Sequence, residues 1–144
     1  MVTVTFFGHR DTPQAIQGIL ESTIENLILN HEKIQFFVGN QGGFDRLVQK
    51  TLHSLEARYP HILCFEILAY FPVADKEKND MQTIYPEGLE KTPPKFAITR
   101  RNRWKVDHSD VVITYVTQIT GGAFQFKKIA EKKGKTVINL PDKK

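Results

Sequence analysis

Cysteine is almost absent from this 144-residue sequence, which contains only Cys64. A single thiol excludes a disulfide framework, a zinc knuckle and a CxxC redox pair. Long apolar runs are absent too: no stretch approaches the roughly 18 residues of a membrane span, and MVTVTFFGHR lacks the pattern of a signal peptide. We therefore expect a cytoplasmic protein with no membrane partner, in which Cys64 is a buried small hydrophobe.

Two further absences narrow the chemistry. Neither GxGxxG nor GxxxxGK[ST] occurs, which disfavours a classical dinucleotide fold and a P-loop NTPase. No set of His, Asp and Glu residues has the spacing of metal ligands. We expect no intrinsic metal ion and no cofactor.

What is present is the composition of one ordinary globular domain, residues 1–144, with 40% apolar and 25% charged residues. The net charge of +4 favours anionic partners. Much of the excess lies in the C-terminal KKIAEKKGK and DKK, where a solvated surface explains it equally well.

Five short runs rich in β-branched and aromatic residues predict strands. They are residues 2–7, 34–38, 62–69, 110–116 and 136–140. Most are apolar nearly throughout, as expected of strands buried on both faces, and helical patterns separate most of them. The expected fold is a three-layer α/β/α sandwich around a five-stranded, mainly parallel sheet of order 3-2-1-4-5.

Apolar spacing predicts a helix after Thr12, with Thr12 as its N-cap and Pro13 at its first position, and a second over 44–59 ended by Pro60. Residues 95–108 and 122–133 are less regular helical candidates, the latter stopped by Gly134. Residues 70–94 contain four prolines and many charges, which predicts a long loop and a candidate lid.

Glycines and polar residues cluster where three predicted strands meet the following helices: GHRDTP (8–13), GNQGGFD (39–45) and TQITGGA (117–123). In a doubly wound sheet, ligands bind outside the carboxyl ends of the strands, where helix N-termini attract anions. We expect the amides of Gly42 and Gly43 to approach a phosphate, with Asn40 and Gln41 bonding a sugar or base. The alternative is purely structural: glycines for tight turns and Asp45 complementing the helix dipole.

ITRRNRWKVDHSD (98–110) supplies guanidinium groups suited to phosphate, and we place Arg101 and Asn102 at the ligand. The alternative is a solvated helix face with Trp104 turned inward. The full predicted ligand set is Gly8, His9, Arg10, Gly39, Asn40, Gln41, Gly42, Gly43, Asp45, Arg101, Asn102, Thr117, Thr120, Gly121 and Gly122.

Taken together, FFGHRDTP, FFVGNQGGFD, AYFP, RRNRW and ITYVTQITGGAFQF resemble the Smf/DprA and LOG superfamily, called SLOG, and its small YpsA-like bacterial and phage branch. GNQGGFD is similar to the SGxAxGID element of DprA, with Gly39, Gly43 and Asp45 matching. The resemblance implies a Rossmann-like domain that binds a nucleotide-derived ligand or single-stranded nucleic acid. It also makes a homodimer one option.

The resemblance leaves catalysis open. LOG phosphoribohydrolases carry PGGxGTxxE, and the corresponding stretch here is TGGAFQFKK. Gly121 and Gly122 match, but Lys128 replaces the glutamate, so the phosphate cradle is kept while the expected carboxylate is missing.

Three functions follow. The first is a sensor or adaptor that binds a nucleotide, nucleotide-sugar or ADP-ribose-like ligand. The second is an enzyme that cleaves the N-glycosidic or phosphate linkage of a nucleotide, using His9 or a loop carboxylate, Glu87 or Glu90. The third is single-stranded DNA binding through Arg100, Arg103, Lys105 and the lysine-rich tail. Adjacent His108, Ser109 and Asp110 do not form a triad, because neighbouring side chains point in different directions.

Overall fold

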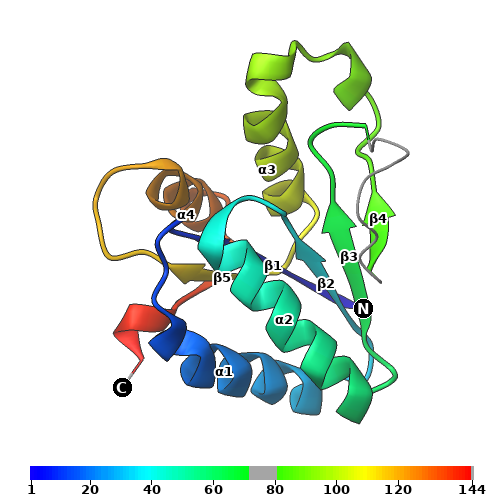
Figure 1. The fold of residues 1–144 in the computed structure, drawn as a ribbon, viewed down its shortest axis with the longest axis vertical. Helices are drawn as coiled ribbons and strands as arrows, with labels where there is room; N and C mark the ends of the chain where they lie inside the picture. The colour runs from blue at the N-terminus through cyan, green and yellow to red at the C-terminus, as the bar shows by residue number, and fades with distance from the viewer. Residues whose placement is uncertain (72–80, 144) are drawn as a thin grey trace.

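A computed structural model describes residues 1–71 and 81–143. Its centre is a six-stranded sheet in which every neighbouring pair is parallel, in the order β4-β3-β2-β1-β5-β6 (Figure 1). The strands are β1 (Val2–Gly8), β2 (Ile34–Val38), β3 (Leu63–Ile67), β4 (Gln82–Ile84), β5 (Val111–Tyr115) and β6 (Thr136–Asn139).

The five predicted strands are all present and in the predicted order, but the strand count was wrong. β4 adds a sixth strand at the sheet edge, from within the segment predicted to be a loop, and it pairs with β3 through three residues. Its sequence, QTI, is too short to show a period. The rest of the candidate lid includes residues 72–80, which lie outside the described residues.

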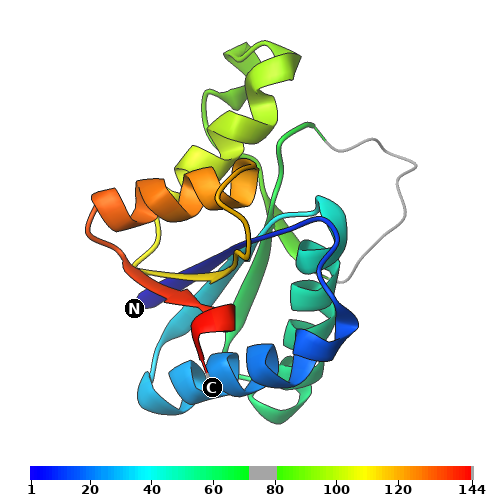
Figure 2. The same ribbon diagram turned by 90° about the vertical axis from the view of Figure 1, so that its left-hand side faces the viewer.

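Four α-helices in the described part of the chain cover the two faces of the sheet (Figure 2). They are α1 (Gln17–Asn30), α2 (Gly42–Arg58), α3 (Ala97–Asp107) and α4 (Gly122–Lys132). Alternation along β1 explains the layers: Phe6 packs in the core with α1 and α2, and Phe7 packs on the other face with Val106 of α3 and Phe126 of α4. Rings of Phe7 and Phe126 stack at 5.3 Å.

The start of the first helix differs from the prediction. Pro13 is extended, with φ −66° and ψ 141°, and precedes a short 3-10 helix, Gln14–Ile16, so α1 begins only at Gln17. Thr12 is not an N-cap, because its hydroxyl donates to the carbonyl oxygen of His9 at 2.5 Å. The C-terminal prediction for α4 is confirmed, since Gly134 has φ +78° and follows Lys133, the C-cap of the helix.

α3 and the segment before it extend beyond the other elements, at the top of Figures 1 and 2. That segment contains two 3-10 helices, Leu89–Lys91 and Pro94–Phe96.

Cys64 is buried in β3 as expected, and burial raises the pKa of its thiol. No helix within residues 1–71 and 81–143 is long and apolar enough to cross a bilayer.

Candidate functional site

The three predicted loops meet at the carboxyl edge of the sheet, and the turn after β1 connects them. Thr117, after β5, donates its backbone N–H to Nε2 of His9 at 2.9 Å. Gly43, at the start of α2, donates its N–H to the carbonyl oxygen of Arg10 at 2.9 Å. Neighbouring residues of one turn therefore hold both other loops in place.

The glycines of GNQGGFD allow this turn to approach closely. Gly42 has φ +87°, a conformation that L side chains rarely adopt. A Cβ on Gly43 would lie 2.5 Å from the carbonyl oxygen of Arg10. The N–H of Gly43 is thus already used inside the protein, and the expectation that it faces a phosphate needs correction.

Gly39 lies beside a buried polar cluster that contains Asp45 and Lys105. A Cβ on Gly39 would lie 2.7 Å from Oδ2 of Asp45 and 3.4 Å from Nζ of Lys105. The Asp45 side chain is 8% exposed, and Oδ2 accepts the N–H of Gln41 at 2.9 Å. Asp45 therefore stabilises the loop before α2 through this hydrogen bond, and its carboxylate is buried rather than exposed to solvent.

Lys105 is the cation in this cluster, and it is only 2% exposed. Its ammonium donates to the carbonyl oxygen of Phe6 at 3.0 Å and lies 4.3 Å from the ring centroid of Phe7. Burial lowers the pKa of Lys105 to about 7; the negative charge of Asp45 opposes that shift and the positive charge of Arg101 adds to it. The predicted contact of Lys105 with single-stranded DNA is wrong, because the Lys105 side chain is buried.

Arg101 is also inside, with 1% exposure. Its Nη1 donates to the carbonyl oxygen of Ile67 at 3.0 Å, and its Nε donates to Oδ1 of Asn102 at 2.8 Å. Burial lowers the pKa of the Arg101 guanidinium, while the nearby carboxylates of Asp45 and Glu66 raise it. Arg101 and Asn102 do lie together, but the guanidinium is engaged by the end of β3; ligand contact stays a prediction.

Glu66 on β3 is the polar residue that the sequence did not single out. The side chain of Asn40 donates to Oε2 of Glu66 at 3.0 Å, and Gln49 donates to Gly39 at 2.9 Å. Glu66 is 3% exposed within a strand that otherwise looks apolar, ILCFEIL. One charge in such a run is the signal that could have identified it, because buried carboxylates require partners. Asn40 is thereby held, while Gln41 beside it is exposed.

Gly8 has a packing role. A Cβ there would lie 2.2 Å from Cγ of Phe44, whose ring is buried in the main core. The turn after β1 can pass over α2 only because this position has no side chain.

The start of α4 is different, because no described side chain occupies the space in front of its first amides. Gly121 is the N-cap with φ +94°, and no side chain caps the helix. A Cβ added to Gly121 or Gly122 would meet nothing within 4 Å, and residues 117–122 are all exposed. Ile119 is 84% exposed. Neither α2 nor α4 has a side-chain N-cap, but only the glycines at the start of α4 have open space in front of them.

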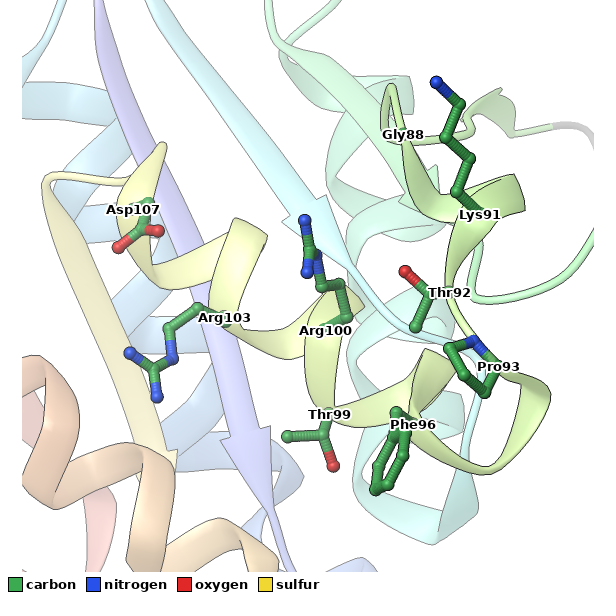
Figure 3. A pocket seen from close by; sticks show the side chains of 9 residues that line it. All are labelled: Gly88, Lys91, Thr92, Pro93, Phe96, Thr99, Arg100, Arg103 and Asp107. Atoms are coloured by element: carbon green, nitrogen blue, oxygen red, sulfur yellow. The ribbon is translucent and has the colours of Figure 1, made fainter.

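Two exposed arginines lie elsewhere, on α3. Arg100 and Arg103 line a groove of about 770 Å³ between α3 and the segment from Gly88 to Pro93, and Figure 3 shows both side chains. They also line an adjoining cavity of about 190 Å³. Neither cavity includes a residue of the glycine loops.

The alternative chemistries have little support in the described geometry. Glu90 is exposed, and Glu87 lines the smaller α3 cavity rather than the glycine loops. Asp110 accepts the N–H of Thr3, and His108 bonds the carbonyl oxygen of Trp104. No group of three or more His, Cys, Asp or Glu side chains that could hold a metal ion occurs in the described part of the chain.

Comparison with known proteins identifies the fold. Neither a protein-family model nor a curated protein matches the sequence. The X-ray structure of DNA processing protein A (DprA) from Streptococcus pneumoniae matches with a TM-score of 0.67 at 19% sequence identity. The match covers 95% of this chain and 49% of the DprA chain, so the chain spans about half the length of DprA. The chain thus has a Rossmann-like α/β fold that is similar to part of DprA.

Proposed function

We propose that the protein binds a nucleotide-derived ligand at the carboxyl edge of the sheet, as a sensor or adaptor of the YpsA-like SLOG branch. The observation that carries this proposal is the uncapped, glycine-lined start of α4, which is open to solvent beside the turn after β1. The first amides of a helix and its dipole favour a negatively charged group at such a place.

The roles of the side chains follow from their exposure. Gly121, Gly122 and Ala123 offer backbone N–H groups to a phosphate, and exposed Arg10 provides the charge that complements it. Gln41 is exposed at the α2 loop and is available to a sugar or base. Buried Arg101, Lys105 and Asp45 keep the strand ends and the α2 loop in position.

The other two functions and the homodimer remain alternatives. The enzyme alternative has no carboxylate at the α4 start, where Lys128 replaces the LOG glutamate and is exposed. Single-stranded DNA is favoured by the exposure of Arg100 and Arg103 and by the structural match to a DNA processing protein. If the protein binds single-stranded DNA, its affinity for DNA should fall steeply as the salt concentration rises.

A first test is calorimetric titration with nucleoside monophosphates, nucleotide-sugars and ADP-ribose. We expect at least one to bind saturably, and Arg10→Ala to weaken that binding by about 1.5–3 kcal/mol, the value of a charge-assisted hydrogen bond. Absence of binding to every ligand at millimolar concentration would overturn the proposal. Release of free base from a bound nucleotide, seen by chromatography, would favour the enzyme.

Gly122→Asp separates binding from folding. A carboxylate in the first turn of α4 complements the dipole and should raise stability by about 0.3–1 kcal/mol, yet it repels a phosphate. Gly18→Asp is the matched control, since Gly18 lies in the first turn of α1 with open space around it. We expect only Gly122→Asp to abolish binding; equal binding by both variants would contradict a phosphate at α4.

A further inference from the structure

The groove of about 770 Å³ beside α3, called the α3 groove below, is lined by charged, hydroxyl and aromatic side chains. The proposed function does not involve these side chains. Three cations, Lys91, Arg100 and Arg103, line the groove, together with one acid, Asp107. The carboxylate of Asp107 is engaged by the ammonium of Lys133 from the end of α4. The groove therefore has an excess of positive charge that its own acid does not balance.

The two guanidinium groups are available to a ligand. Arg100 and Arg103 are exposed, and no carboxylate in residues 1–71 and 81–143 forms an ion pair with either. Residues three apart on a helix are neighbours on its surface, so both forks project from one stripe of α3. Paired forks of this kind match the oxygens of a phosphate better than ammonium groups do.

Hydroxyl and aromatic groups line the same groove. Thr92 and Thr99 lie between the cations and Phe96, as Figure 3 shows. The ring of Phe96 is 52% exposed, and the ammonium of Lys95 lies 5.1 Å from its centroid. An exposed aromatic face beside positive charge is where a flat ring of a phosphate ester can stack. The volume of about 770 Å³ is in the range of small-molecule sites.

We propose that the α3 groove is a second binding site, for a phosphate ester with a flat ring: phosphate on Arg100 and Arg103, ring on Phe96. That chemistry belongs both to a free nucleotide and to single-stranded nucleic acid. This second site is independent of the proposed phosphate site at the start of α4, because the two sites share no residue.

Trp104 provides a direct readout. It is the only tryptophan in the sequence, and it lines the smaller cavity together with both arginines. Intrinsic fluorescence of the whole chain, titrated with adenosine monophosphate, should change saturably. Inorganic phosphate alone should bind more weakly, because it has no ring to place on Phe96. A short oligothymidylate is the third probe, and tighter binding of it than of the nucleotide would assign the ligand to nucleic acid.

The decisive variant is Arg100→Gln/Arg103→Gln, compared with Arg46→Gln. Arg46 is an exposed residue of α2, on the opposite side of the sheet. We expect the double variant to bind the better probe at least about tenfold more weakly, and Arg46→Gln to bind it unchanged. Phe96→Ala should remove the preference for the ring-bearing probe over inorganic phosphate.

The absence of a saturable fluorescence change with any probe at millimolar concentration would overturn this site. Equal affinity in the double variant and the native protein would also overturn it. Gly122→Asp distinguishes the two sites. Loss of the Trp104 signal in that variant would assign the signal to the start of α4 and contradict the groove, and an unchanged signal supports it.

Discussion

Gly8 and Gly18 show that one residue type has opposite roles in this chain. Gly8 is required, because a Cβ would meet the buried ring of Phe44 at 2.2 Å, whereas a Cβ on Gly18 would meet nothing within 4 Å. We expect Gly8→Ala to lower the free energy of unfolding by about 1–3 kcal/mol through overpacking. Gly18→Ala should raise it by up to about 1 kcal/mol, because alanine favours a helix. Urea unfolding of both variants checks this, and equal effects would contradict the packing described.

Lys105 makes stability depend on pH. Its pKa is about 7 in the folded protein, where Phe6, Asp45 and Arg101 surround it, and 10.5 in the unfolded chain. Between these values the unfolded chain binds more protons, so stability should rise with pH. Below about pH 7 the ammonium is charged in both states and its burial cost is fully present.

Lys105→Met tests this linkage. Methionine removes the titrating group with little change of volume, so the variant should lose this part of the rise in stability between about pH 7 and pH 10.5. The measurement is the free energy of unfolding of both proteins across that range. Parallel curves would show that Lys105 keeps its ordinary pKa in the fold.

The sequence alone could identify Gly39, Gly43 and Asp45 as unusual residues, but it could not show what they contact. A loop glycine that faces a ligand and one that faces a neighbouring backbone look alike in a sequence. Only the contacts of Arg10 with the α2 loop distinguish them. The same limit applies to Arg101, because a run of arginines does not show which one turns inward.

Among the elements, α2 shows which contacts dock a helix. At its C-terminal end Arg58 forms ion pairs of 3.0 Å with Glu21 and Glu25 of α1. Exposed pairs of this kind contribute little, and Arg58→Gln should lower the free energy of unfolding by less than about 1 kcal/mol, an effect that salt reduces. Leu55→Ala should cost about 2–5 kcal/mol, because Leu55 is fully buried in the core.

Thermal and urea unfolding of both variants at low and high salt measures this difference. A larger loss for Arg58→Gln than for Leu55→Ala would mean that charge, and not apolar packing, docks α2.

Element positions were largely predictable because apolar runs have clear periods. The five strands follow from β-branched runs, and α2 follows from its apolar spacing between Phe44 and Leu55. β4 could not be found, since three residues among prolines and charges have no period. The late start of α1 was missed because Pro13 reads equally well as a first helical residue and as an extended residue before one.

For the whole molecule, the fold separates two regions that contain hydrogen-bond donors with no protein partner within residues 1–71 and 81–143. One is the start of α4 at the carboxyl edge of the sheet, and the other is the α3 groove with Arg100 and Arg103. Parallel strand order alone predicts the first region. The second depends on how residues 86–107 fold back on themselves, which no local pattern in the sequence specifies.

The proposed function requires a phosphate at the uncapped start of α4. Amide NMR spectra of the uniformly labelled protein, recorded during titration with whichever nucleotide binds in calorimetry, test it most directly. We expect the largest shifts at Gly121, Gly122 and Ala123, with smaller ones at His9 and Arg10. Saturable binding that leaves these amides unchanged would contradict the proposal.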